Sequence, residues 1–316
     1  MSIARFDFSV KRFVLAPLAG WSDPPFRAVA KYFGADLTIS EMISADALVR
    51  NPLKTKKLYA KSPLETPFAV QLVGSSVVVV GEAARMLSDE EGIDVIDLNA
   101  GCPAPKIARG GGGSALLKNP ATLGEMIGAI KKNGGQKLTS AKIRLGFEKN
   151  DGVALAKVCE EAGADFITVH ARTKTGGFAA PPNYEAIGEI KSRLKIPVIA
   201  NGDIDGYEKA QSVFQTTNAD GAMIGRAALA APWIFAQLKT NLPIADRAIK
   251  REVVLAHFDH TIQLYGARGA IIFRKRLHKY CKGFEQAAQF RSAINRESDP
   301  SVTRSLIDEF FSAQRN

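Results

Sequence analysis

The sequence contains few cysteines. The three that it has, Cys102, Cys159 and Cys281, lie far apart. No CxxC pair offers metal ligands, and no even-numbered set offers a disulfide framework. We therefore expect no bound metal, and we expect the protein to work in a reducing compartment, the cytoplasm.

Long apolar runs are also missing. Residues 1–7 lack the apolar segment of a secretory leader, and no stretch approaches the roughly 18 uncharged residues that a membrane-spanning helix needs. Low-complexity sequence is confined to a glycine run at 110–113. We expect no leader peptide and no membrane partner, and a chain of 316 residues can bury a large core.

Acidic residues are outnumbered by basic ones. The chain has 42 Lys and Arg against 32 Asp and Glu, a net charge of +10. A positive field favours polyanions such as nucleic acid, and also anionic membranes. Many basic proteins bind no nucleic acid, so the charge alone does not identify a partner.

Short β-rich runs alternate with helix-like stretches over most of the chain. Most of the runs are almost continuously apolar, as in parallel strands that are buried on both faces. Eight strands with helical crossovers over about 235 residues match a (β/α)8 (TIM) barrel, whereas an open, doubly wound α/β sheet is the alternative. The count of eight, and the lack of a GxGxxG motif after the first strand, favour the barrel. The expected strands are 13–17, 36–40, 67–73, 93–99, 140–145, 165–170, 197–201 and 221–225, and the expected helices between them include 25–33, 77–87, 121–132, 153–162, 183–194 and 207–215.

The pattern changes after residue 237. Residues 239–243 have the composition of a linker, with a proline that ends the preceding helix. Beyond them the spacing is purely helical, with candidate helices at 246–265, 268–280, 283–293 and 300–313. We expect a barrel domain at residues 1–240 and a small C-terminal helical bundle at 241–316.

A cluster of basic residues marks the second of these helices. Residues 268–282 contain six Lys and Arg and no acidic residue. This is either a solvated helix face or a phosphate-binding surface. The six are Arg268, Arg274, Lys275, Arg276, Lys279 and Lys282.

Polar or glycine residues end nearly every expected strand. In a (β/α)8 barrel these ends meet at one rim, where active sites lie. A single polar residue there is explained by capping, but eight are hard to explain by packing, since buried polar groups need partners. The set comprises 17–20, Glu41, Gln71, Asn99 with Cys102, Lys142 with Arg144, His170 with Arg172, Asn201 with Asp203, and Gly225 with Arg226.

Two of these strand ends resemble a phosphate cradle. The seventh strand ends in Asn201-Gly202-Asp203 and the eighth in Gly225-Arg226. The loops after strands seven and eight often hold a phosphate in barrels. Glycine admits oxygens close to backbone N–H groups, and an arginine adds a charge-assisted fork. The simpler interpretation is that both glycines only form tight turns.

Three further residues suit a polar ligand at the rim. Lys142 lies in an otherwise apolar strand, where a lysine is costly unless it faces an anion or extends to the surface. The anionic N1/O2 edge of a reduced flavin is one such anion. Gln71 ends the third strand and is placed to bond a flavin edge, and His170 ends the sixth strand.

Cys102 lies on a loop just beyond the fourth strand, between Gly101 and Pro103. Free cysteines are usually inert and buried, but this one is expected at the catalytic face, as a nucleophile or a general acid. Cys159 and Cys281 fall within expected helices, and we assign both to structure.

Several segments together resemble the tRNA-dihydrouridine synthase family. The opening APLAGWSDPPFR at 16–27 and NAGCP at 99–103, followed by GSALL at 113–117, are the most specific. KIRLG at 142–146, VHART at 169–173, IANGD at 199–203, MIGR at 223–226 and RKRLHKY at 274–280 follow in the family's order. The resemblance covers about residues 14–282, nearly the whole chain.

The resemblance implies an activity and a set of site residues. The family binds FMN at the top of the barrel, NADPH reduces it, and hydride passes from flavin N5 to C6 of a flipped-out uridine in tRNA. The loop cysteine, here Cys102, donates a proton to C5. Asn99 and Arg172 would lie near the uracil or the phosphate, and Arg274 and Lys275 would belong to a helical tRNA-binding domain. A monomer is expected, with tRNA as the partner and no protein partner. The FMN contacts implied are Pro17, Leu18, Ala19, Gln71, Lys142, His170, Asn201, Gly202, Asp203, Gly225 and Arg226.

The sequence departs from the family around the expected substrate cleft. After Arg172-Thr173 the family often has a glutamine, a tyrosine, a glycine and an Asp-Trp pair. Position 100 is alanine where a larger residue is common. The departing positions are Ala100, Gly176, Phe178, Ala180, Asn183 and Tyr184.

Two rival functions are consistent with parts of the sequence. A flavin oxidoreductase acting on a free small molecule, similar to a dihydroorotate or dihydropyrimidine dehydrogenase, would share the barrel and cradle but would not need the basic helix. A catalytically silent RNA-binding barrel would need neither a flavin site nor Cys102.

Overall fold

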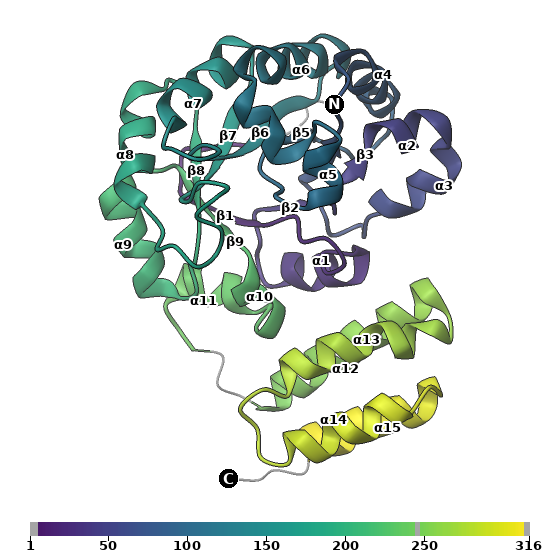
Figure 1. The fold of residues 1–316 in the computed structure, drawn as a ribbon. Coiled ribbons are helices and arrows are strands. Elements are labelled where there is room, and N and C mark those ends of the chain that lie inside the picture. The colour runs from purple at the N-terminus through teal and green to yellow at the C-terminus, as the bar shows by residue number, and fades with distance from the viewer. Residues whose placement is uncertain (1–5, 244–246, 313–316) are drawn as a thin grey trace.

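The computed structural model describes residues 6–243 and 247–312, and a closed barrel of parallel strands forms its centre (Figure 1). Pairing of β1 with β9 and of β2 with β4 closes a ring of eight strands. All eight predicted strands are confirmed, and the open, doubly wound alternative is wrong. The ring consists of β1 (Arg12–Leu15), β2 (Leu37–Ile39), β4 (Phe68–Val73), β5 (Val95–Asn99), β6 (Leu138–Arg144), β7 (Phe166–His170), β8 (Val198–Asn201) and β9 (Gly221–Ile224).

A layer of helices covers the outside of this ring (Figure 1). A large apolar core fills the space between strands and helices, and a smaller one, including Val14, Phe166 and Met223, fills the barrel interior. Ser76, Asn119 and Asn183 each cap a helix by accepting a backbone N–H, as polar residues at that position are expected to do. The helices are α1 (Pro24–Tyr32), α4 (Val77–Ser88), α6 (Pro120–Asn133), α7 (Gly152–Glu161), α8 (Tyr184–Arg193) and α9 (Tyr207–Thr217).

Several short elements were not predicted. None is longer than seven residues, which is too short for a helical period to be read from sequence. The additional strand β3 (Ile43–Ser44) pairs with the end of β4. The unpredicted helices are α2 (Ala45–Arg50), α3 (Pro52–Lys56), η1 (Lys57–Tyr59), α5 (Pro105–Arg109), η2 (Gly113–Lys118), α10 (Arg226–Ala230) and α11 (Ile234–Thr240).

Four aspartates tie neighbouring strands together in pairs at the start of the barrel. Each carboxylate accepts a hydrogen bond of 2.7–2.8 Å from the backbone N–H near the start of the preceding barrel strand, and the aspartate's own N–H donates back to that residue's carbonyl. Two positions earlier, the chain turns through the left-handed region, which favours Gly or Asn. These aspartate clamps join Asp36 to Phe13, Asp94 to Phe68, Asp165 to Thr139 and Asp220 to Val198, after turns at Gly34, Gly92, Gly163 and Asn218.

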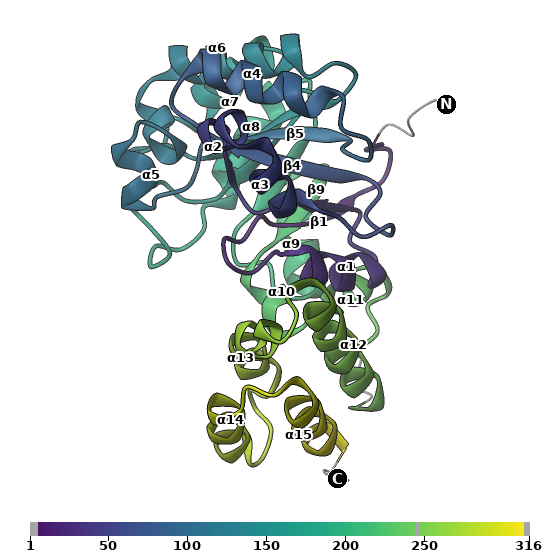
Figure 2. The ribbon, with the colours of Figure 1, turned by 90° about the vertical axis from the view of Figure 1, so that its right-hand side faces the viewer.

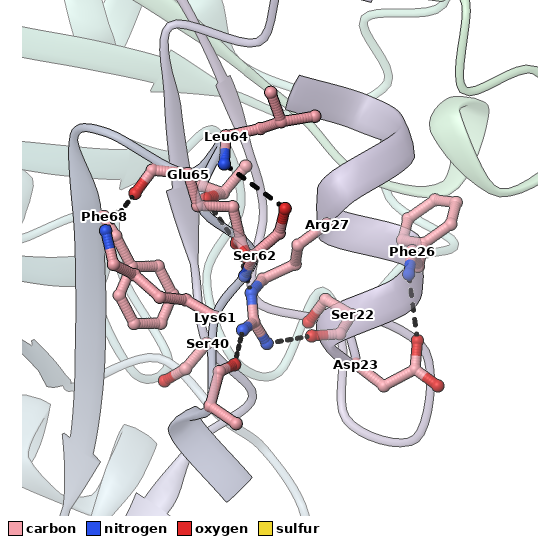
Figure 3. Close-up of polar contacts among 12 residues, drawn as sticks. Ser22, Asp23, Phe26, Arg27, Ser40, Lys61, Ser62, Leu64, Glu65 and Phe68 are labelled. Carbon is pink, nitrogen blue, oxygen red and sulfur yellow. Dashed lines mark hydrogen bonds and ion pairs between the residues drawn. The ribbon is translucent and has the colours of Figure 1, made fainter. Parts of the chain in front are cut away.

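A buried ion pair fixes the loop between β1 and α1. Arg27 of α1 points toward Glu65, and both side chains are 0% exposed (Figure 3). Nε of Arg27 donates to Glu65 Oε1 at 2.7 Å, and Nη1 donates to the Ser22 carbonyl at 2.9 Å. The Ser22 hydroxyl in turn accepts the N–H of Leu18 at 2.8 Å. The pair therefore anchors residues 18–22, which lead from the barrel rim into α1.

Four C-terminal helices form the predicted bundle, which lies beside α1 and α10 (Figure 2). Its apolar core includes Phe258, Phe273 and Phe310, and it also takes in Val29 of α1 and Trp233. No helix in the described part of the chain is long and apolar enough to cross a membrane. The helices are α12 (Arg247–Tyr265), α13 (Arg268–Tyr280), α14 (Ala287–Arg296) and α15 (Pro300–Ser312).

The third helix of the bundle is confirmed but begins later than predicted, at Ala287. Its expected start at residue 283 lies in a turn, because Gly283 and Gln286 have φ of 86° and 56° and so break a helix there. The linker expected at 239–243 begins only at Asn241, the left-handed cap of α11, because this helix continues to Thr240. Residues 246 and 313, the expected ends of two helices, lie outside the described residues.

Candidate active site

A cavity of about 480 Å³ opens at the carboxyl ends of the strands. Every residue predicted to contact the cofactor lines it, and so do Asn99 and Cys102. Arg172, Arg274 and Lys275 are not among its lining residues. Arg144, which was expected at this rim, also lines the cavity, and so do Met42 and Phe178, which were not among the predicted site residues.

Lys142 lies in the wall of this cavity, on β6. Burial, and after it the neighbouring Arg144, lowers its pKa to about 8, although the charge of Asp97 opposes the shift. Among the described residues its ammonium has one hydrogen-bond acceptor, Asn201 Oδ1 at 3.0 Å. Asn201 is itself held by the Met223 carbonyl, which accepts from its Nδ2 at 2.9 Å. Two of the three Lys142 N–H donors are therefore left for a group in the cavity.

His170 ends β7 beside this lysine. Burial, together with the positive charges of Lys142 and Arg144, holds its pKa far below the ordinary value. The imidazole is therefore neutral at pH 7, with one donor and one acceptor nitrogen. It can bond a neutral polar ligand edge without adding another charge to a cationic wall.

Asp203 links two arginines at one end of the cavity. Its carboxylate accepts hydrogen bonds from Arg172 and from Arg226, and the Arg172 bond is the main reason why its pKa is lowered. Arg172 is buried behind this carboxylate and does not itself line the cavity. The Arg226 guanidinium lies 4.6 Å from the ring centre of the exposed Phe178, within cation–π range. Phe178 is one of the positions at which the sequence departs from the family.

The loop that carries Cys102 is held by backbone contacts. Asn99 Oδ1 accepts the N–H of Cys102 at 2.9 Å, and the Gly101 carbonyl accepts Nε of Arg144 at 2.8 Å. Gly113, the last residue of the glycine run, packs directly against the Cys102 loop. A Cβ at this position would lie 2.8 Å from the Cys102 carbonyl oxygen, so there is no room for a side chain. Cys102 is partly exposed and lines the cavity.

Asp97 is the polar residue that sequence reasoning missed. It is buried in β5, and burial raises its pKa to about 6, although hydrogen bonds from Ser140 and Gln71 oppose the shift. The signal was available, since an aspartate within Val-Ile-Asp-Leu-Asn is as anomalous as the lysine at 142.

The other two cysteines lie in the cores. Cys159 and Cys281 are fully buried, and burial raises the pKa of the Cys159 thiol to about 12. This agrees with their assignment to structure. No group of three or more His, Cys, Asp or Glu residues in the described part of the chain is arranged to hold a metal ion.

The six basic residues on and just after α13 have different environments. Arg276 is only 2% exposed, and its guanidinium bonds Asp23 and the Trp21 carbonyl, so it is not available to a phosphate. Arg274 is partly buried against the Glu297 carbonyl. Lys275 is exposed, bonds the Gly20 carbonyl and lies 5.0 Å from the Trp21 ring centre, near the cavity rim. Arg268, Lys279 and Lys282 are exposed.

Comparisons with known proteins agree with this geometry. Residues 14–315 match the family described as dihydrouridine synthase (Dus). A Helicobacter pylori protein named "Probable tRNA-dihydrouridine synthase" is 46% identical over 310 residues, which cover 98% of this chain and 94% of that protein. The "tRNA-dihydrouridine synthase B" of Pseudomonas aeruginosa is 35% identical over 314 residues, covering 96% and 94%. The solved structure of a variant of NCR from Zymomonas mobilis has a TM-score of 0.51 at 18% identity, over 76% of this chain and 89% of that one, which is a likeness of fold alone.

Proposed function

The chain belongs to the dihydrouridine synthase (Dus) family, and we propose that it reduces a specific uridine of tRNA to 5,6-dihydrouridine with FMN in the barrel cavity and NADPH as the reductant. The near full-length match makes it an enzyme, a tRNA-dihydrouridine synthase. The observation that carries the proposal is that Cys102 and Lys142 line the same cavity as the cradle at Gly225 and Arg226.

The residues of the cavity fit FMN. Lys142 has two N–H donors that are free for an anionic N1/O2 edge, and the neutral His170 and the amide of Gln71 lie in the same wall. At the other end, Arg226 and the glycines of the two cradle loops suit the phosphate group. The remaining FMN contacts that we propose are Pro17, Leu18, Ala19, Asn201, Gly202, Asp203 and Gly225.

Cys102 is proposed as the general acid. FMN held by these residues and reduced by NADPH would supply the hydride that C6 of the uracil receives. Because the C5=C6 bond is conjugated with the C4 carbonyl, negative charge develops at C5 and O4, and an acid must quench it. The thiol of Cys102 would give its proton to C5. Asn99 and, acting through Asp203, Arg172 would help to hold the uracil or the adjoining phosphate. The base must leave its stack to enter the cavity.

The helical bundle is proposed as the tRNA-binding domain, residues 241–316, beside a catalytic FMN domain, residues 1–240. The exposed Lys275 and Lys279 lie 5.0 and 5.9 Å from the ring centre of Trp21, close to the rim of the cavity. Lysines there would contact phosphates next to the flipped base. We propose that the enzyme is a monomer and works in the cytoplasm, where its tRNA substrate is found.

Charge reversal on α13 tests this docking surface. We expect Lys275→Glu with Lys279→Glu to weaken tRNA binding by roughly tenfold at moderate salt, and to reduce the slope of log affinity against log salt by about one for each lysine. Titrations by fluorescence anisotropy at several salt concentrations measure both. Lys195→Glu is the matched control, since this exposed lysine precedes β8 at the opposite end of the barrel. An unchanged salt slope in the double variant would exclude α13 as the RNA surface.

The activity itself is tested by mass spectrometry of tRNA nucleosides. We expect dihydrouridine-free tRNA, incubated with the purified protein and NADPH, to gain dihydrouridine at one mapped position. Failure to form dihydrouridine with a yellow protein that NADPH reduces would refute the proposed activity. If a free pyrimidine then reoxidised the flavin, the site would serve a small molecule instead.

A further inference from the structure

We propose that Asp97 is a positioning residue: through Gln71 and Asn99, its carboxylate fixes the direction of a hydrogen-bond relay that seats the Cys102 loop. Gln71 Nε2 donates to Asp97 Oδ2 at 2.7 Å, and Asn99 Nδ2 donates to Gln71 Oε1 at 2.7 Å. Asn99 Oδ1 then accepts the N–H groups of Cys102 at 2.9 Å and Gly101 at 3.2 Å. The inference deepens the proposed function, because it concerns the residue proposed as the acid.

The relay has a direction because its two ends differ in chemistry. An ionised carboxylate only accepts hydrogen bonds, and a backbone N–H only donates them. The two amides between them are each able to flip, but with these ends only one arrangement satisfies every contact. Asp97, Gln71 and Asn99 lie on the adjacent strands β4 and β5, where Gln71 and Asp97 are in register. The rigid barrel wall thus determines how the loop amides are held.

The three side chains of the relay are buried, so a mismatched hydrogen bond among them would be costly. Asp97 is 1% exposed, Gln71 0% and Asn99 8%. A mismatched amide there would leave donors facing donors or acceptors facing acceptors with no water to relieve them. The second Asp97 oxygen accepts the Ser140 hydroxyl at 2.6 Å, so the carboxylate is itself held in place from β6. A displacement of about 1 Å at a reacting group is enough to cost on the order of a hundredfold in rate.

The test reverses the relay. In Asn99→Asp, the new carboxylate faces the Gln71 carbonyl oxygen, and neither of these groups can donate a hydrogen bond. Gln71 cannot flip to correct this, because Asp97 must accept a hydrogen bond from its amide nitrogen. One contact of the relay is therefore always lost. In the double variant Asp97→Asn with Asn99→Asp, Gln71 is able to flip, so that it donates to the new carboxylate at position 99 and accepts from the new amide at position 97, and every contact is satisfied again. Asp97→Asn alone keeps an acceptor for Gln71 but no longer excludes the flipped amide, so its effect is expected to lie between wild type and Asn99→Asp. Ser140→Ala is the control for the other carboxylate oxygen.

Limited digestion with trypsin reports whether the Cys102 loop is held in place, and it does not require an active enzyme. Two trypsin sites, Lys106 and Arg109, lie in α5, the segment that follows Cys102. We expect Asn99→Asp to speed cleavage at these two sites by ~10-fold or more, and the double variant to restore the rate to within ~3-fold of wild type. Cleavage at Arg193 in α8, together with the melting temperature, reports any global loss of stability. Single-turnover reduction of tRNA uridine is expected to fall and recover in parallel.

Additive effects would overturn the proposal. If the double variant were cleaved as fast as Asn99→Asp, or if cleavage at Arg193 rose equally, positions 97 and 99 would not communicate through Gln71. Loop seating that recovers in a protein that forms no dihydrouridine even as wild type would support the relay while refuting the proposed function. The two failures are therefore distinguishable.

Discussion

Replacing Cys102 by alanine is expected to lower the rate at which tRNA reoxidises the pre-reduced enzyme by about 10²- to 10⁴-fold, the usual contribution of a positioned general acid. FMN content and reduction by NADPH should stay near wild type, because the thiol lies on the loop after β5 and not on the proposed FMN contacts. Stopped-flow absorbance of the flavin follows both half-reactions separately.

Two further variants sharpen this experiment. Cys281→Ala removes a buried thiol of the helical bundle and is expected to react with tRNA at the wild-type rate. Cys102→Ser keeps a small hydroxyl in the same place but a much weaker acid, so it should fall between wild type and Cys102→Ala. A Cys102→Ala enzyme that reduced uridine at full speed would exclude the thiol as the proton donor.

Removing Glu65 is expected to lower the free energy of unfolding by about 3–5 kcal/mol, because Glu65→Leu leaves the guanidinium of Arg27 buried without its carboxylate. Replacing both partners, as Arg27→Met with Glu65→Leu, should recover most of that loss, since a buried pair often contributes little beyond an apolar pair of similar size. Urea unfolding followed by circular dichroism gives both values.

The chain provides a matched control for this pair. Lys56 and Glu90 also approach to 2.7 Å, but their side chains are 57% and 29% exposed. Glu90→Leu should therefore cost no more than about 1 kcal/mol. Equal losses at the two pairs would show that burial does not govern the effect. Because Arg27 also bonds the Ser22 carbonyl, Glu65→Leu should in addition weaken FMN binding at residues 17–19.

The sequence predicted the barrel and most of the cavity because both leave local signals. Strands buried on both faces are continuous apolar runs, and the residues that interrupt them, such as Lys142, are conspicuous. Asp97 gave the same signal and was overlooked. The short helices α5 and α10 span less than two turns and leave no period to detect.

The environments of the individual basic residues could not be predicted from the sequence. Arg276 and Lys275 are neighbours with the same charge, but one lies beneath Trp21 against Asp23 and the other is exposed. Which face of α13 meets the barrel depends on how the bundle packs, and no local pattern encodes that. In the same way, the bridge from Arg172 through Asp203 to Arg226 joins residues that follow three different strands, β7, β8 and β9.

The aspartate clamps divide the barrel into four modules, each of which consists of two neighbouring strands. Within each module a single helix links the two strands: α1, α4, α7 and α9. Every longer excursion follows the second strand of a module: β3 to η1 after β2, α5 and η2 after β5, the Phe178 loop after β7, and α10, α11 and the bundle after β9. The first strands and the loops that follow them supply Pro17, Gln71, Lys142 and Asn201. Most of the proposed cofactor contacts therefore follow the first strand of a module, and the second strands add His170, Gly225 and Arg226. Because the second strands also carry every long insertion, they are where new loops, and with them new substrates, can be accommodated.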